Sequence, residues 1–188
     1  MWTVGLGCGF AAGARVAMGV YASAMLQSVV DGTGSTAHIC VLGGTQRVWI
    51  AIVPGWWTWR MASTGGRRTQ SYCTAVGKAF IAFMQPHLLD TLIDGLQFKR
   101  HTRHTIMSPS ALRTELERVR RRGFAVDDEE VEEGLRCIGA PIRDYTGNVV
   151  AAMSMAGPVF RIQTGKVARY ALAAPQAAAK LLPALAHA

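Results

Sequence analysis

The sequence lacks the cysteine patterns of metal-binding and disulfide-rich proteins. It has four cysteines in 188 residues, and they lie far apart in the chain with no Cys-x-x-Cys pair. This spacing matches neither a zinc site nor a dense disulfide framework, so reduced thiols in a cytoplasmic protein are expected. His101 and His104 are close in sequence, but no carboxylate or cysteine stands at a matching spacing. We therefore predict no metal and no cofactor.

Long hydrophobic runs are also missing. The apolar segment 4–30 is interrupted by Arg15 and by several glycines, and it contains no continuous run of about eighteen apolar residues. It also lacks the basic leader of a signal peptide. The sequence therefore predicts no membrane segment. Because 50% of the residues are hydrophobic, the chain can bury a sizeable core, and a single domain over residues 1–188 is expected.

Aromatic residues make up only 8% of the chain, and no basic stretch is interleaved with them as in proteins that bind single strands of nucleic acid. The net charge is +8, and basic residues cluster at Arg67–Arg68, Lys99–His104 and Arg118–Arg122. The last cluster is spread around a predicted helix rather than along one face, and no recognition helix follows a helix-turn pattern. We interpret these clusters mainly as solvated faces and predict that this chain does not bind DNA by itself.

The most informative stretch runs from Gly123 to Pro158. Six of the chain's twelve acidic residues fall between Asp127 and Glu133. Leu135–Ile142 and Val149–Ala156 are then expected to form two strands, because the Asp and Gly of the segment 144–148 are typical of a tight turn. The acidic run could pair with the basic cluster of residues 118–122, which would make both runs structural.

Each of these two strands has one face of small side chains, since alternate residues of a strand point to the same side. Cys137 and Gly139 lie on that face of the first strand, and Ser154 and Ala156 lie on that face of the second. One interpretation is a ligand pocket floored by Cys137, Ser154 and Ala156, with Asp127 near its rim. The other is a helix that lies close against a sheet of small residues.

A helix is predicted to begin after Thr74, which is a favourable N-cap. Its first turn would contain Ala75, Val76 and Gly77, whose N–H groups have no acceptor within a helix. Small residues there would let an anion approach. A carboxylate would then meet these donors and the positive end of the helix dipole. The alternative is an ordinary capped helix without a ligand.

The remaining patterns predict an α/β chain of the α+β type. Further strands are expected at Ala37–Leu42 and Val48–Val53, joined through Gly43–Gly44. Helices are expected over segments 2–30, 108–122 and 164–185, and a short helix or turn over 87–96. The helix over 108–122 is capped by Ser108 and ended by Gly123.

Trp56–Met61 contains three of the five tryptophans, Trp56, Trp57 and Trp59. Core or dimer packing is one interpretation of these aromatic side chains, and a hydrophobic wall for a ligand is the other.

No constellation of residues indicates an enzyme. Cys73 precedes a helix N-terminus, where the pKa of a thiol can fall, but no histidine is placed by the sequence to act as its base. Cys137 lies in the middle of a predicted strand. The acidic run lacks a second, distant acid for general acid–base catalysis. We therefore predict that the chain is not an enzyme, and a small cysteine-dependent hydrolase is kept as an alternative.

Three sequence motifs connect the chain to a known family. They are VDDEEVEEGLRCIGAPIRD followed by a strand ending S-x-x-GP (residues 126–158), T-A-x-G-K-A (residues 74–79) and SPSALRTELERVRRRGFAVDDEE (residues 108–130). Together they resemble the effector-binding domain of the IclR family of bacterial transcription regulators. The resemblance is long and covers nearly the whole chain.

The resemblance implies a GAF-like fold, in which helices flank a curved, mostly antiparallel sheet. It implies a homodimer or homotetramer that senses a small-molecule effector, usually an organic acid. Operator DNA would be bound only through an N-terminal winged helix-turn-helix domain, which is absent here, and residues 1–12 would correspond to the end of the linker helix. An oligomerisation module without a ligand is the alternative function.

The resemblance also directs attention to one set of ligand-binding residues. Backbone donors are expected at Ala75, Val76 and Gly77, polar contacts at Asp127 and Ser154, and pocket lining at Cys137, Ala156 and Met61. Family members often carry a second hydroxyl where this chain has Ala156, and a Pro and a His where it has Gln70 and Tyr72. The missing hydroxyl at Ala156 favours a less polar ligand end, such as an aromatic one beside the tryptophans. Gln70 and Tyr72 imply that the effector cannot be taken over from better-known relatives.

Overall fold

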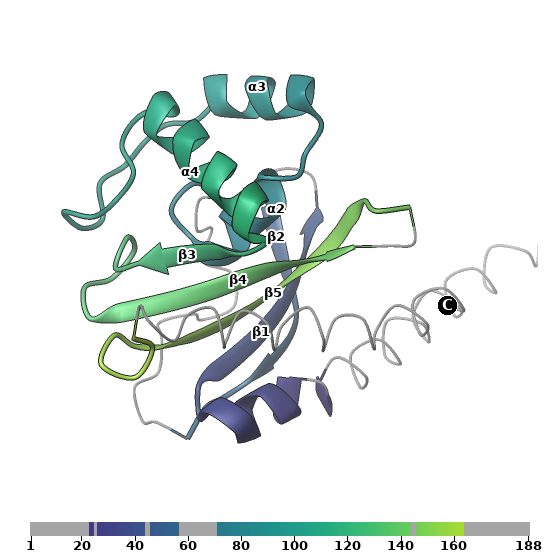
Figure 1. Ribbon diagram of the computed structural model, residues 1–188, viewed down its shortest axis with the longest axis vertical. Coiled ribbons are helices and arrows are strands. Elements are labelled where there is room, and N and C mark those ends of the chain that lie inside the picture. Colours follow the sequence, from purple (N-terminus) through teal and green to yellow (C-terminus); the bar gives the residue numbers. More distant parts are fainter. Residues whose placement is uncertain (1–22, 25, 44–45, 57–70, 144–145, 164–188) are drawn as a thin grey trace, which may run out of the picture.

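The computed structural model describes residues 23–24, 26–43, 46–56, 71–143 and 146–163. Within these residues five strands form one antiparallel sheet in the order β2-β1-β5-β4-β3 (Figure 1). The strands are β1 (Thr36–Gly43), β2 (Gln46–Val53), β3 (Ala125–Asp128), β4 (Leu135–Arg143) and β5 (Val149–Pro158). The predicted hairpin strands and the predicted antiparallel α+β fold are confirmed, with strands slightly longer than expected.

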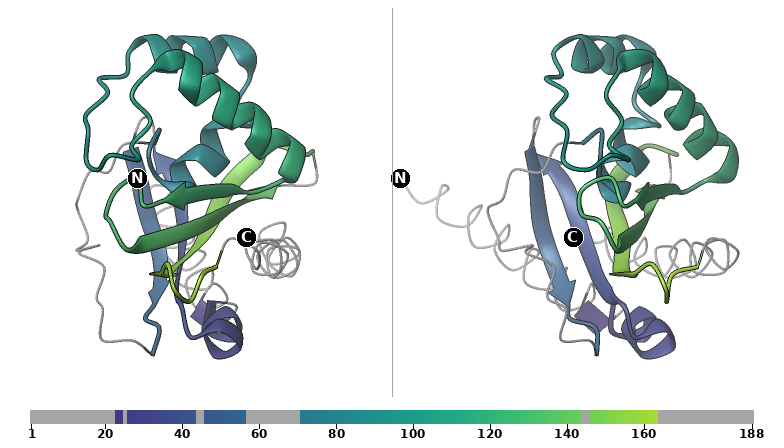
Figure 2. Two further views of the ribbon diagram at one scale, coloured as in Figure 1. Left: turned by 60° about the vertical axis from the view of Figure 1, so that its left-hand side comes forward. Right: turned by 90° about the vertical axis from the view of Figure 1, so that its left-hand side faces the viewer.

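Helices cover both faces of the sheet. On one face, α2 (Ala75–Ile81) contacts β3, β4 and β5. The helices α3 (Pro86–Asp94) and α4 (Pro109–Arg122) lie outside α2, farther from the sheet (Figures 1 and 2). On the other face, the helical segment 26–33 packs its apolar residues Leu26, Val29 and Val30 against the sheet. The sheet is therefore the middle layer of the domain.

The alternation of side chains along the strands divides the core into two parts. Large apolar residues such as Ile39, Ile138 and Met153 face the helical segment 26–33. Small residues face α2. A separate apolar cluster holds the helices together, and it includes Tyr72, Ile81, Leu89, Ile93, Leu112 and Leu116. The short helix α2 thus packs on the small-residue face of the sheet.

The caps predicted from the sequence are confirmed. The Thr74 hydroxyl accepts a hydrogen bond from the amide of Gly77 (3.3 Å), and the Ser108 hydroxyl accepts one from the amide of Ala111 (3.2 Å). Gly123 ends α4 in a left-handed conformation with φ of 82°, and its amide donates to the Val119 carbonyl (2.8 Å). These local signals fix where α2 and α4 begin and where α4 ends.

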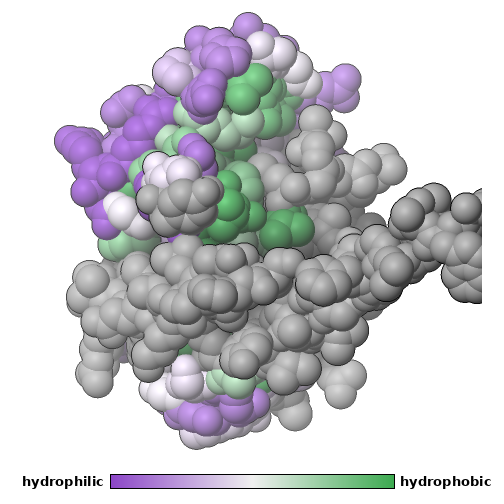
Figure 3. Space-filling model, turned by 90° about the vertical axis from the view of Figure 1, so that its right-hand side faces the viewer, coloured by the Kyte–Doolittle hydropathy of each residue, from purple (hydrophilic) through white to green (hydrophobic). Residues whose placement is uncertain are grey.

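The predicted pairing between the acidic run and the arginines of α4 is wrong. Glu115 pairs with Arg118 and Arg122, and Glu117 pairs with Arg120, so the arginines find partners on their own helix. Residues three apart on a helix are neighbours, which explains the pairs Glu115–Arg118 and Glu117–Arg120, and Arg122 reaches Glu115 two turns away. Hydrophilic side chains also cover much of the outer surface of the helical layer (Figure 3).

The acidic run pairs instead with cations from other elements, which are Lys78, Arg103 and Arg136. Its first two residues also form the end of β3, an edge strand that the sequence analysis did not expect. In the part of the chain that the structure describes, no helix is long and apolar enough to cross a membrane. The predictions for segments 1–22, 57–70 and 164–188, which include Met61, Gln70, Trp57 and Trp59, lie outside the described residues.

Candidate functional site

The strand register brings the candidate residues of the sheet into two neighbouring rows. In the first row Asp127 lies opposite Cys137, and Cys137 lies opposite Ala156. In the second row Ser154 lies opposite Gly139, two residues further along. Because residues two apart on a strand share a face, all of these positions look toward α2.

The first turn of α2 lies directly on these rows. Ala75 packs with Leu135, Cys137 and Ala156 in one small apolar cluster. A Cβ atom at Gly139 would come within 2.5 Å of the carbonyl carbon and oxygen of Ala75. The structure thus shows the close helix-on-sheet packing that was one of the two interpretations of the small residues. The same packing brings the start of α2 to Cys137 and Ala156.

The amides of the first turn are not equivalent. The Gly77 amide donates to the Thr74 hydroxyl, so the cap already satisfies it. A Cβ at Gly77 would also come within 2.5 Å of the Ser71 Cα, so glycine here serves the packing of the preceding loop. Ala75 and Val76 occupy the first two helical positions, whose N–H groups have no acceptor within the helix. They are the amides of α2 that a ligand could use.

The sequence analysis expected Asp127 at the rim of this region. In the structure the residue is buried, with 3% of its surface exposed. Its Oδ1 accepts a hydrogen bond from the Glu130 amide (2.9 Å). Burial raises the pKa of Asp127 to about 6, although the nearby Lys78 ammonium and the hydrogen bonds from the backbone act in the opposite direction. The carboxyl is therefore poised to change its charge close to neutral pH.

A buried ion pair between Lys78 and Glu130 lies beside Asp127, and the sequence analysis missed it. The Lys78 ammonium of α2 bonds to Glu130 Oε1 and donates to the Val126 carbonyl (2.6 Å). Burial raises the pKa of Glu130 to about 7 against the opposing effect of Lys78. No local pattern could have revealed a pair whose members lie in separate motifs.

Cys137 is buried, and burial together with the negative charge of Asp127 raises the pKa of its thiol well above the ordinary value. The thiol is therefore protonated at neutral pH, whereas a nucleophilic cysteine needs a lowered pKa and some exposure. Cys73 is also fully buried. Both thiols have the character of packing groups.

His38 of β1 is a further polar residue on this face, and it lies opposite Ser154. Both side chains are buried. Burial lowers the pKa of His38 to about 4, against the effect of a hydrogen bond with the Ser154 backbone, so the imidazole is neutral at physiological pH. The sequence analysis did not name His38, although the alternation of residues in the predicted strand Ala37–Leu42 indicated that it shares a face with Cys40.

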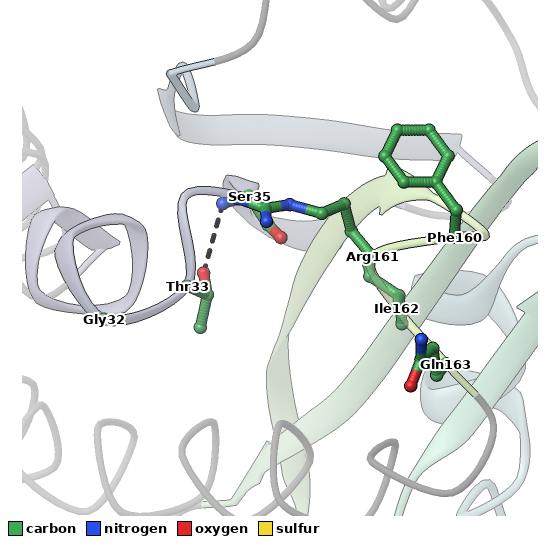
Figure 4. A pocket seen from close by; sticks show the side chains of 7 residues that line it. All are labelled: Gly32, Thr33, Ser35, Phe160, Arg161, Ile162 and Gln163. Atoms are coloured by element: carbon green, nitrogen blue, oxygen red, sulfur yellow. Dashed lines mark hydrogen bonds between the residues drawn. The ribbon is translucent and has the colours of Figure 1, made fainter.

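A separate cavity of about 290 Å³ opens where β1 begins and β5 ends. Its lining residues come from the end of the helical segment 26–33 and from the turn after β5, and they are Gly32, Thr33, Ser35, Phe160, Arg161, Ile162 and Gln163. In Figure 4 the Arg161 side chain extends toward Ser35, whose amide donates to the Thr33 hydroxyl (3.2 Å). Those ligand-binding residues singled out from the sequence that the structure describes lie on the α2 face or in α2 instead.

Comparison with known proteins identifies the family. The family model described as the C-terminal region of bacterial IclR transcriptional regulators matches residues 14–182. The chain is 36% identical over 149 residues to the HTH-type transcriptional regulator KdgR of Escherichia coli, an alignment that covers 79% of this chain and 57% of that protein. The chain therefore spans little more than half the length of this relative, which is a transcriptional regulator.

Solved structures agree with this result. The IclR protein of Thermotoga maritima superposes with a TM-score of 0.83 at 33% identity, covering 89% of this chain and 68% of that one. The C-terminal domain of the Escherichia coli regulator KdgR superposes with a TM-score of 0.77 at 30% identity, covering 90% of this chain and 98% of that domain. The chain belongs to the IclR family of bacterial transcriptional regulators and has the fold of its C-terminal regulatory domain.

Proposed function

We propose that this chain is the effector-sensing domain of an IclR-type regulator and that its effector is a small organic acid bound at the first turn of α2. The observation that carries the proposal is the packing of the first turn of α2 onto the small side chains of the sheet, where Ala75 contacts Cys137 and Ala156 and Val76 contacts Cys40 and Ala152. Two backbone donors at the positive end of a helix favour a carboxylate. The small side chains below them leave the ligand an apolar neighbour.

The proposal assigns different roles to the residues around this turn. Ala75 and Val76 bind the carboxylate through their amides, and Ser154 and Asp127 contact the polar atoms of the ligand. Cys137 and Ala156 line the apolar side, and Met61 is proposed to complete the lining. Since Ala156 offers no hydroxyl, the site favours a ligand with a less polar end, such as an aromatic acid.

In the whole regulator this domain would control DNA binding. Regulators of this family bind DNA through their N-terminal domain and bind small-molecule effectors. We propose that the whole protein is cytoplasmic, acts as a dimer or tetramer, and changes its affinity for operator DNA when the acid binds. The burial of Cys73 and the buried, protonated thiol of Cys137 argue against the alternative of a cysteine-dependent hydrolase.

The first test is thermal unfolding of the chain with pyruvate, benzoate and 4-hydroxybenzoate, each compared with its amide. A ligand at one hundred times its dissociation constant adds about 2.7 kcal/mol to the stability, which is readily measured. A rise with an acid but not with its amide supports the sensor. If no acid and no amide raises the unfolding temperature, the oligomerisation module without a ligand becomes the better account.

A variant then tests the location of the site. Ser154→Ala should weaken the binding of an acid found in this panel by about tenfold, because a lost hydrogen bond to a charged group costs about 1.5–3 kcal/mol. Ser110→Ala, on the exposed surface of α4, is the matched control. Equal affinities of the two variants would remove Ser154 from the site.

A further inference from the structure

Three buried ionisable side chains meet between α2 and the sheet. They are Lys78 of α2, Asp127 of β3 and Glu130 of the segment that follows β3. None exposes more than 6% of its surface. Charged groups are rarely buried to this extent, because removing them from water costs several kcal/mol each unless they are paired.

The contacts of these three groups link α2 to Asp127. The Lys78 ammonium holds the Glu130 carboxylate and also the carbonyl of Val126, the residue before Asp127. The Glu130 amide in turn donates to Asp127 Oδ1. Lys78 and Glu130 therefore position the carboxyl of Asp127 relative to the first turn of α2.

The hydroxyls of two threonines hold this segment from the other side. Thr102 donates to the Glu129 carbonyl (2.6 Å), and Thr105 donates to the Glu130 carbonyl (2.7 Å). The segment that carries Glu130 is thus fixed on both sides. When a charge is added nearby, Glu130 can therefore take up a proton more easily than the segment can move away.

The charges of the cluster do not balance. Two carboxyls face one ammonium. The other acidic groups near them are Asp128, Glu115 and Glu132, of which Asp128 is paired with Arg136 and Glu115 with Arg118 and Arg122, so the cluster itself keeps one surplus negative charge. In the part of the chain that the structure describes, Glu130 Oε2 is buried without a hydrogen-bond partner. One bound proton would neutralise the surplus charge and give one of the two carboxyls a donor. Burial raises the pKa of both acids toward neutrality, in agreement with one surplus negative charge in the cluster.

We propose that Asp127 and Glu130 share one titrating proton near neutral pH and that an organic acid binding at the first turn of α2 takes this proton up. The inference rests on the function proposed above. The carboxylate of the ligand would add a second negative charge beside Asp127, which raises the proton affinity of the pair. A protonated carboxyl there could also donate a hydrogen bond to the ligand. Lys78 is a positioning residue in this scheme, whereas Asp127 and Glu130 hold the proton.

The linkage has a measurable consequence. Where both carboxyls are ionised in the ligand-free protein, the uptake of one proton makes the dissociation constant rise about tenfold for each unit of pH. Where one of them is already protonated, the dissociation constant is independent of pH. The affinity for an acid should therefore be flat below about pH 6 and should fall steadily above about pH 7.5.

The first experiment needs no ligand. The side-chain carboxyl carbons of Asp and Glu are followed by NMR in the 188-residue chain as the pH changes, and Asp127→Asn and Glu130→Gln assign the two signals. We expect coupled midpoints between about pH 5.5 and pH 7.5 for the pair. Titration of both carboxyls near their ordinary values of about 4 would overturn the proposal. The wild-type titration decides the question even if one variant fails to fold.

The second experiment measures proton uptake. Pyruvate and benzoate are titrated calorimetrically into the chain at pH 8 in phosphate and in Tris, whose ionisation enthalpies differ. Uptake of about one proton supports the proposal. Glu130→Gln should reduce the uptake, whereas Glu133→Gln, at an exposed position, should leave it unchanged.

The outcomes separate this inference from the proposed function. An acid that binds without proton uptake overturns the linkage and leaves the sensor intact. If neither acid binds, the proposed organic-acid sensor fails, and the linkage that rests on it fails as well. The NMR midpoints would then still show whether the cluster holds a proton.

Discussion

Substitution of Gly139 tests the close packing on which the candidate site depends. A Cβ atom at this position would lie 2.5 Å from the carbonyl carbon and oxygen of Ala75 and 2.8 Å from the Val76 amide nitrogen. All three are backbone atoms, so no flexible side chain can move aside. Gly139→Ala must displace the first turn of α2 by about 1 Å. Overpacking of this kind costs about 1–3 kcal/mol.

Urea unfolding measures this loss directly. Gly32→Ala is the control, because a Cβ there meets nothing within 4 Å and the residue lies in a helical segment. We expect Gly139→Ala to lower the free energy of unfolding by about 2 kcal/mol and the control to leave it unchanged or slightly raised. Gly139→Ala should also weaken the binding of an acid found in the panel. A variant as stable as the wild type would refute the inferred contact between α2 and β4.

The remaining predictions concern the buried charges and the cap. Lys78→Met leaves Glu130 buried without its cation and should lower the free energy of unfolding by about 3–5 kcal/mol in urea unfolding. The double variant Lys78→Met/Glu130→Gln should recover much of this loss. Because burial raises the pKa of Asp127 to about 6 and that of Glu130 to about 7, their contribution to stability is full below pH 4 and is lost as the pH rises through 7. Between pH 5 and pH 8 the free energy of unfolding of the wild type should therefore decrease by on the order of 3 kcal/mol, and the double variant Asp127→Asn/Glu130→Gln should lack this decrease. Burial lowers the pKa of His38 to about 4, so the stabilising contribution of the neutral imidazole is present above pH 6.5 and is lost as the pH falls toward 4. His38→Asn should therefore make the free energy of unfolding less dependent on pH between pH 4 and pH 6.5. Thr74→Ala removes the cap of α2 and should cost about 1 kcal/mol in thermal unfolding, whereas a change below 0.3 kcal/mol would contradict that role.

The sequence predicted those parts of the fold that local chemistry determines. Thr74, Ser108 and Gly123 act at helix ends through their own hydroxyls or backbone conformation, so their positions marked the ends of α2 and α4 correctly. The alternation along β4 and β5 similarly identified the face of small side chains, for which a closely packed helix was one of two interpretations. Such signals depend on neighbours within a few residues.

The parts that could not be predicted depend on distant partners. Ala125–Asp128 is a short edge strand with two aspartates, and only its pairing with β4 makes it a strand. Lys78 and Glu130 lie in separate motifs, each with the appearance of a solvated charge until the fold buries both. The burial of Asp127 has the same origin. Sequence spacing alone also could not show how closely Ala75 approaches Gly139.

The most direct test of the account maps an acid onto the backbone amides by NMR. Benzoate, or whichever acid raises the unfolding temperature in the panel, is titrated into the isotope-labelled chain. The account predicts that the largest shifts fall on Ala75 and Val76 and on their neighbours Ser154 and Ala156. Shifts concentrated instead around Ser35 and Arg161, which line the cavity at the start of β1, would contradict it.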